Sequence, residues 1–224
     1  MALIKNLHKS GFDVRVYHYT RKEIQLPGIT CVAIKEKRWS ALFFLSRLER
    51  YIRYFFKISL SKPLEKVFGF SFTLFNDRNS IIAALEKIED FNSDLVLTLS
   101  KGGSFRPHHA LLKMPNLHKK WIAYIHDPYP MHLYPRPYNW VEAGYYKKWR
   151  FMKDVSEKAA FTEFPSKLLM ECMGSYFTGN QEKGLVIPHQ ISSEEISETI
   201  IPEYFSPDKF HLIPTGHLLW GRVP

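Results

Sequence analysis

Residues 121–128, with the sequence WIAYIHDP, decide the predicted fold. The first five are apolar or aromatic, as is typical of a strand that lies inside a parallel sheet. The run then ends at an imidazole, a carboxylate and a proline. Residues 94–99, DLVLTL, have the same character and predict a second interior strand of that sheet.

Helix and strand patterns alternate outward from these two strands. Gly11 is expected to end the first helix, and Asn79 is expected to cap the helix that runs to residue 89. The predicted helices cover residues 2–10, 40–57, 80–89, 107–113, 139–158 and 165–173, and the predicted strands cover 12–19, 29–34, 94–99, 121–125, 160–164, 184–189 and 210–214. This alternation predicts an α/β protein: a Rossmann-like parallel sheet flanked by helices.

The composition is that of a folded, basic protein. Its 224 residues, 45% hydrophobic and 24% charged, exclude a mainly disordered chain. The 31 Lys and Arg against 22 Asp and Glu give a formal charge of +9, which favours anionic partners. Cys31 and Cys172 fit no disulfide or zinc pattern, and no apolar run is long enough to cross a bilayer. With no signal-peptide pattern at the N-terminus, we expect a cytoplasmic protein.

Residues that follow the strands are the first candidates for a site, because open α/β sheets bind ligands beyond the carboxyl ends of their strands. His126 and Asp127 are the strongest pair. The imidazole can act as a base or hydrogen-bond donor, and the carboxylate can accept a substrate hydroxyl. The structural alternative is that His126 satisfies a backbone carbonyl and Asp127 caps a turn before proline.

Glycines after two other predicted strands suggest phosphate contacts. Gly102 and Gly103 could wrap a phosphate, although a tight turn explains them equally well. Gly216 follows the last predicted strand, and Arg222 could grip a diphosphate. His108 and His109 point in different directions on a helix and form a poor metal pair, so no metal is predicted.

Segment 38–57 has one apolar and one basic side on a helical wheel. Its apolar residues are Phe44, Leu45, Leu48, Tyr51, Ile52, Phe55 and Phe56, and its basic residues are Arg47, Arg50, Arg53 and Lys57. Such a helix can lie on an anionic membrane surface. It can equally pack its apolar side on the core and leave the basic side in solvent. No nucleic-acid-binding pattern is present, so no nucleic-acid partner is expected.

Four short motifs in a fixed order resemble a known family. They are HKSGFDVRV at 8–16, IHDP at 125–128, KGLVIPH at 183–189 and LIPTG at 212–216. Together they resemble the N-terminal half of GT-B glycosyltransferases, especially the retaining family 4 group. The resemblance covers nearly the whole chain.

The resemblance implies a Rossmann-like N-terminal domain, residues 1–205, that binds the acceptor. Residues 206–224 would be the linker and first strand of a second domain, which binds the nucleotide sugar. His126 would lie beside the transferred sugar with Asp127 adjacent, and Gly216 and Arg222 would contact the donor diphosphate. The family's first strand and the donor-site carboxylate pair have no counterpart here, so this chain alone is expected to be inactive.

Two functional hypotheses follow. The first is a glycosyltransferase of the hexosyltransferase type, which uses a nucleotide-sugar donor with no other cofactor. It would modify a glycan or lipid-linked acceptor in cell-envelope polysaccharide biosynthesis, in the cytoplasm or peripherally at the inner face of the membrane. The second is a non-enzymatic Rossmann-like module that binds an anionic membrane surface or a protein partner through residues 38–57.

Overall fold

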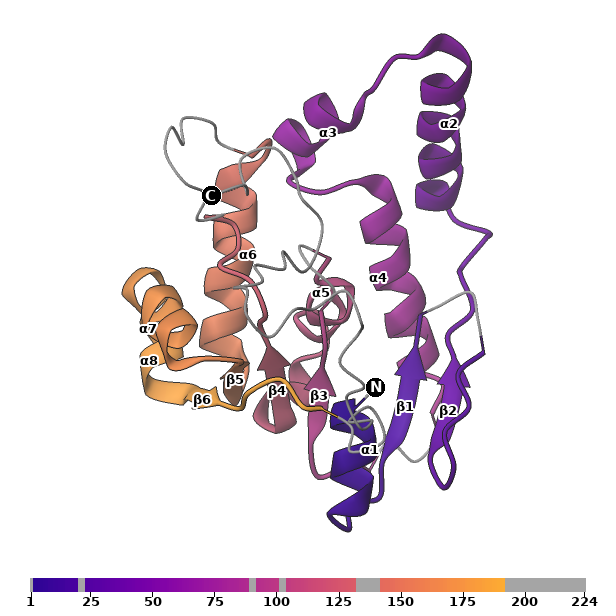
Figure 1. Ribbon diagram of the computed structural model, residues 1–224. Helices are drawn as coiled ribbons and strands as arrows, with labels where there is room; N and C mark the ends of the chain where they lie inside the picture. Colours follow the sequence, from indigo (N-terminus) through magenta and orange to yellow (C-terminus); the bar gives the residue numbers. More distant parts are fainter. Residues whose placement is uncertain (1, 20–22, 89–91, 101–103, 132–141, 192–224) are drawn as a thin grey trace, which may run out of the picture. The chain divides into compact units, whose positions relative to one another are not determined.

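Figure 1 shows the computed structural model, in which two compact units are recognised. The described residues are 2–19, 23–88, 92–100, 104–131 and 142–191. The first unit comprises Met1–Val14, Leu133–Trp140 and His189–Pro224, and the second comprises Arg15–His132 and Val141–Pro188. The expected domain boundary at residues 205 and 206, like the predicted strand 210–214, lies outside the described residues.

The first unit contains the predicted N-terminal helix, α1, Ala2–Lys9. Gly11 follows it with φ +93°, a left-handed conformation that favours glycine, and its N–H donates to the carbonyl of His8 at 3.0 Å. Asn6 Nδ2 donates to Gln190 Oε1 at 3.0 Å. The helix and its glycine end are therefore confirmed.

The second unit holds two parallel sheets. Strands β1, Arg15–His18, and β2, Thr30–Ala33, form one of them. The other has the order β3, Val96–Thr98; β4, Trp121–Tyr124; β5, Phe161–Phe164; and β6, Gly184–Val186. Ile122 lies opposite Leu97 on one side and Phe161 on the other. The predicted α/β, Rossmann-like architecture with parallel strands and flanking helices is confirmed.

Strand β3 differs from the prediction in its place in the sheet. Within the described ranges it pairs with β4 alone and forms the edge of the four-stranded sheet, whereas residues 94–99 were expected to be interior. Leu95, just before the strand, is exposed, and Val96 and Leu97 are half-buried. An apolar run shows that a strand packs against something, but it does not show how many neighbours the strand has.

The helices mostly follow the predicted pattern, with one large shift. The described helices are α2, Ala41–Phe56; α3, Ser61–Phe68; α4, Phe72–Leu85; α5, Arg106–Leu111; α6, Tyr145–Lys158; α7, Lys167–Tyr176; α8, Gly179–Lys183; and the 3-10 helix η1, Pro115–Lys120. The predicted cap at Asn79 is wrong, because α4 begins at Phe72 and Ser71 Oγ accepts from the Leu74 N–H at 3.2 Å. Helices α3, α8 and η1 were not predicted.

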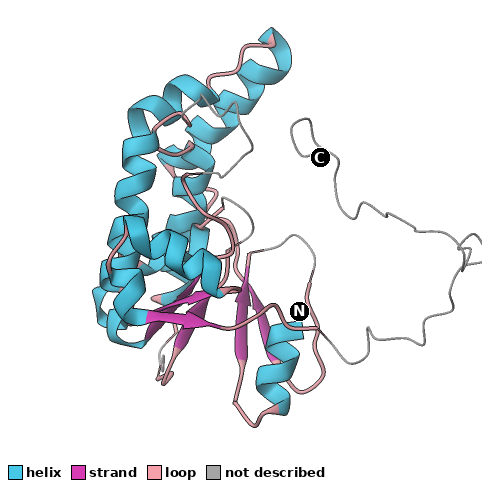
Figure 2. Cartoon of the chain, turned by 60° about the vertical axis from the view of Figure 1, so that its left-hand side comes forward, coloured by secondary structure: helices cyan, strands magenta, loops and turns pink. Residues whose placement is uncertain are grey.

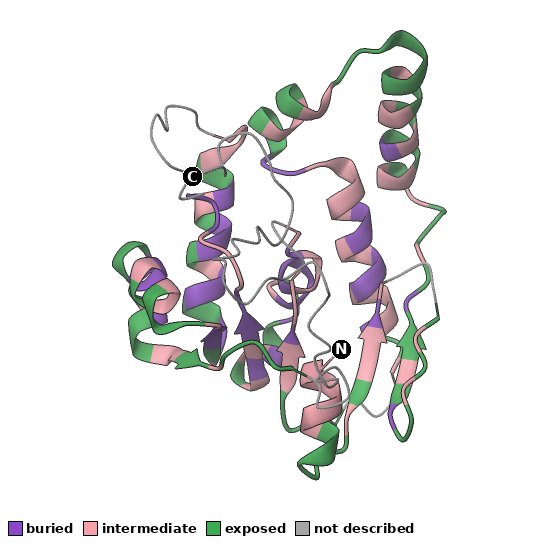
Figure 3. Ribbon diagram, viewed as in Figure 1, coloured by how far each residue is buried: buried purple, intermediate pink, exposed green. Residues whose placement is uncertain are grey.

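The core of the second unit lies between its four-stranded sheet and its helices. Trp121, Ala123 and Ile125 alternate along β4 and just beyond it, and all three are completely buried. They pack in one cluster with Phe105, Leu111, Phe151, Met152, Val155, Phe164 and Met173. The helices of this unit gather on one side of the strands (Figure 2), and the buried residues concentrate there (Figure 3). Ile122 and Tyr124, which alternate with the core residues, therefore face the other side of the sheet.

A buried lysine joins α3 to α6. Lys148 Nζ lies 2.8 Å from Glu65 Oε2 and 2.9 Å from Glu142 Oε2. Burial alone would lower the pKa of Lys148, but the two carboxylates outweigh it and raise the pKa. Gly144 permits this close approach: it has φ +74°, and a Cβ there would lie 2.1 Å from the carbonyl oxygen of Glu65.

Replacing Lys148 by Met should lower the free energy of unfolding by about 2–3 kcal/mol, because two partly buried carboxylates would lose their counter-charge. Urea denaturation measures the change. The matched control is Lys153→Met on the same helix, since Lys153 pairs with Glu157 at the exposed surface. That change should cost less than about 0.5 kcal/mol, and equal losses in the two variants would contradict this account.

Candidate functional site

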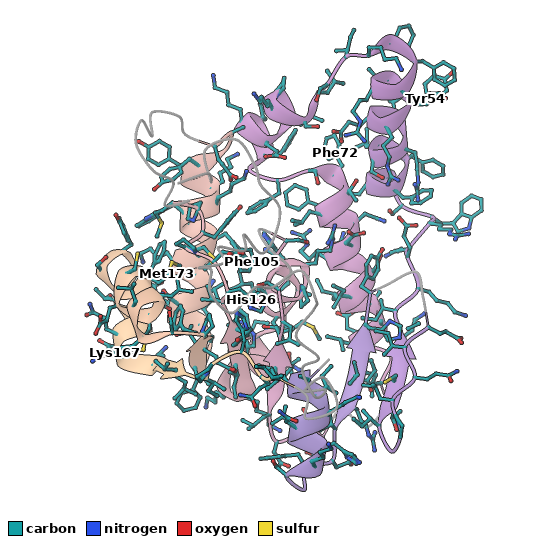
Figure 4. The ribbon with its side chains drawn as sticks, viewed as in Figure 1. Tyr54, Phe72, Phe105, His126, Lys167 and Met173 are labelled. Carbon is teal, nitrogen blue, oxygen red and sulfur yellow. The ribbon has the colours of Figure 1, made fainter. Side chains whose placement is uncertain are left out.

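The carboxyl ends of β3, β4 and β5 meet at one edge of the parallel sheet. Ser100 follows β3 after one residue, and His126 follows β4 after one residue. Figure 4 labels His126 just beyond its strand, in the centre of the second unit. The structure thus places the strongest predicted site residue at the edge where α/β sheets bind ligands.

His126 bridges the segments that follow β3 and β4. Its ring nitrogen Nε2 lies 2.6 Å from the carbonyl oxygen of Ser100, and its ring meets that of Tyr124 edge to face with centroids 4.5 Å apart. Because a carbonyl only accepts, Nε2 carries a proton and donates it, and Nδ1 is the acceptor in the neutral ring. The structural alternative, that His126 satisfies a backbone carbonyl, is therefore confirmed for one ring nitrogen.

Asp127 forms a tight turn next to His126. Its backbone carbonyl accepts the N–H of Tyr129 at 2.8 Å, and its side chain is half-buried. Asp127 is therefore held beside His126, as the sequence order predicts.

Glu163 is a polar residue of this sheet that the sequence analysis missed. It lies on β5 directly opposite Tyr124, so both side chains are on the sheet face opposite the core. Its side chain is only 3% exposed, and within the described residues its Oε1 has no hydrogen-bond partner. Burial raises the pKa of Glu163 to about 7. Near neutral pH this carboxyl group can therefore either donate or accept a hydrogen bond.

Two histidines of α5, His108 and His109, are buried in the core. His108 Nε2 donates to the carbonyl oxygen of Tyr124 at 3.1 Å, and complete burial lowers the pKa of His108 to about 3. His109 stacks on Phe151 with ring centroids 3.8 Å apart, and burial lowers its pKa to about 3 as well. Both rings are neutral at physiological pH. Across the described ranges, no group of three or more His, Cys, Asp or Glu side chains could hold a metal ion.

A second polar cluster lies beyond the end of β1. Tyr19 and Arg106 both bond to the carboxylate of Asp77, and Arg106 also donates to Ser104 Oγ. Burial, followed by the charge of Asp77, raises the pKa of Tyr19. Burial also raises the pKa of Asp77, although Tyr19 and Arg106 oppose this effect. Sequence patterns did not indicate this cluster, because its members come from three separate segments.

The other predicted site residues lie outside the described residues. These are Gly102, Gly103, Gly216 and Arg222. Their proposed phosphate and diphosphate contacts remain predictions.

Comparisons of the chain with protein-family models, with curated proteins and with solved structures found no match.

The raised pKa of Glu163 predicts how stability depends on pH. The folded state holds a proton on Glu163 up to about pH 7, whereas an unfolded glutamate loses it near pH 4.5. The contribution of Glu163 to stability should therefore fall by up to about 3 kcal/mol as pH rises from 4.5 to 7, while the lowered pKa values of His108 and His109 act in the opposite direction.

Urea denaturation at a series of pH values tests this dependence. The free energy of unfolding of Glu163→Gln relative to that of the wild type should rise by up to about 3 kcal/mol between pH 4.5 and 7, because both proteins keep His108 and His109. Glu182→Gln, at an exposed position, is the matched control and should keep the wild-type profile. A wild-type profile in Glu163→Gln would contradict the buried, protonated carboxyl group.

Proposed function

We propose that this chain is the acceptor-binding half of a GT-B type glycosyltransferase. In this proposal a sugar passes from a nucleotide-sugar donor to a glycan or a lipid-linked acceptor. The observation that carries the proposal is the placement of His126 at the carboxyl edge of the parallel sheet, held by its 2.6 Å contact with Ser100. The family resemblance of the four motifs points to the same residue.

Sugar transfer needs positioned substrates, stabilisation of the departing diphosphate and a polar group beside the anomeric carbon. His126 would supply the last of these through a hydrogen bond to the transferred sugar. Its ring is well suited to this role, because the Ser100 carbonyl fixes both its tautomer and its orientation.

Acidic side chains nearby would bind the acceptor. Asp127 follows His126 directly and would accept a hydrogen bond from an acceptor hydroxyl. Glu163, with its pKa near 7, is able to take up a proton from such a hydroxyl. The donor diphosphate would be bound by Gly216 and Arg222, with the backbone at Gly102 and Gly103 as further phosphate contacts.

A non-enzymatic binding module is the alternative function. It would keep the fold and the strand-end residues without binding any nucleotide sugar. Nucleotide-sugar turnover therefore distinguishes the two functions directly.

Replacing His126 by Ala should lower the rate of sugar transfer by roughly ten- to hundredfold, as expected for the loss of a hydrogen bond of about 1.5–3 kcal/mol in the transition state. The measurement is transfer from a panel of radiolabelled nucleotide sugars to membrane extract, catalysed by the gene product that carries residues 1–224.

The matched control is His118→Ala. His118 makes the same kind of contact, from Nε2 to the Leu111 carbonyl at 2.9 Å, but it lies in η1 at the opposite end of the strands. It should keep wild-type activity. If no nucleotide sugar is bound or turned over, the binding-module function replaces this proposal.

A further inference from the structure

Helix α2 packs on the protein by one side only. Among its residues, all of which the structure describes, Ser46 alone is buried. The helix packs against α4, and Ser40, its N-cap, donates from Oγ to Asn76 Oδ1 at 2.7 Å. The side of α2 that carries Ser46 is therefore its attached side.

The opposite side of α2 is an exposed apolar stripe formed by Phe44, Leu48, Tyr51 and Phe55. At about 100° per residue these four side chains fall within roughly 60° of arc, nearly opposite Ser46. Each is 53–59% exposed. The ring centroids of Tyr51 and Phe55 lie 4.2 Å apart, so these two side chains form one exposed aromatic surface. The sequence left open whether this side faces the core, and the structure turns it outward.

More apolar side chains surround the stripe. Tyr54 (Figure 4) and Phe56 are 70% and 65% exposed, and Trp39, just before the helix, is 88% exposed. So many aromatic side chains left in water are costly, because each one buried elsewhere would contribute about 1.5–3 kcal/mol. A surface of this kind marks a docking site.

Positive charge is concentrated in the same segment. Residues 35–68 contain nine Lys and Arg but three Glu, a net +6 out of the chain's formal +9. All three glutamates are engaged: Glu36 with Arg47, Glu49 with Ser61, and Glu65 with Lys148. Arg53 and Lys57 are exposed on the side of α2 opposite the stripe, so the helix combines an apolar side with a basic side. A fitting partner therefore has an apolar interior that can take up the stripe and a negatively charged surface that attracts the basic residues.

We propose that α2 docks on an anionic lipid bilayer and lies in the plane of its interface. The stripe enters the boundary between headgroups and acyl chains, where aromatic rings are favoured. The lysines and arginines of residues 35–68 attract the phosphates of anionic lipids, and each one near the surface should raise the affinity by roughly fivefold. No described helix is long and apolar enough to cross a membrane, so this docking is peripheral at α2.

Charge and shape favour a bilayer over other partners. A second copy of the chain would bring two segments of net +6 together. A nucleic acid offers no apolar interior for Leu48 and the leucine beside it, Leu45, which is also exposed. The proposal does not depend on sugar transfer, since it rests on α2 alone.

Vesicle sedimentation with the full chain tests the docking. We expect binding to phosphatidylcholine vesicles that contain phosphatidylglycerol, and little binding to phosphatidylcholine alone. The double change Tyr51→Ser and Phe55→Ser should weaken binding by about tenfold or more. The double change Arg50→Gln and Arg53→Gln should lower the preference for phosphatidylglycerol by up to about 25-fold, at roughly fivefold for each arginine.

The matched control is the double change Tyr146→Ser and Leu168→Ser, which removes two exposed apolar side chains from α6 and α7. It should bind as the wild type does. The proposal is overturned if the chain binds neither kind of vesicle, or if the stripe variant and the control variant bind equally well. So does a dimer in sedimentation velocity that Tyr51→Ser and Phe55→Ser convert to a monomer, because the stripe would then bind a second copy.

Discussion

The burial of one face of β4 is the constraint on which the second unit depends. Trp121, Ala123 and Ile125 are completely buried on that face, and Trp121 Nε1 also donates to Thr98 Oγ1 of β3 at 2.7 Å. His108 holds the end of the same strand through the Tyr124 carbonyl. Since side chains alternate along a strand, this fixed face determines where Tyr124 lies and where His126 leaves the sheet.

The sequence predicted those parts of the fold that depend on local pattern. Apolar runs located β3 and β4, and apolar periodicity located α2. The start of α4 was missed because Asn76, Asp77 and Ser80 are buried in it, and buried polar residues hide the apolar face of a helix. Glu163 was missed for a related reason: one acid in a four-residue strand resembles a residue whose side chain faces solvent, and the sequence does not show that this side chain is buried.

For helix α2, the sequence pattern does not determine which side faces the core. Its periodicity correctly predicted one apolar and one basic side, but periodicity is the same for a helix that faces the core and one that faces outward. Only tertiary contacts decide between these two orientations. Here the side of α2 around Ser46 packs against α4, so the apolar side faces outward. The strand-end edge and α2 belong to the same unit, so a chain that docks through α2 would bring its proposed acceptor site to a membrane.

The central claim is that the sheet edge at His126 binds a sugar. Its most direct test is nuclear magnetic resonance of histidine rings labelled with ¹⁵N, recorded while nucleotide sugars and oligosaccharides are added in turn. The account predicts that at least one of these compounds shifts the ring signals of His126 and leaves those of His118 unchanged. Unchanged His126 signals with every compound, or equal shifts at both histidines, would contradict it.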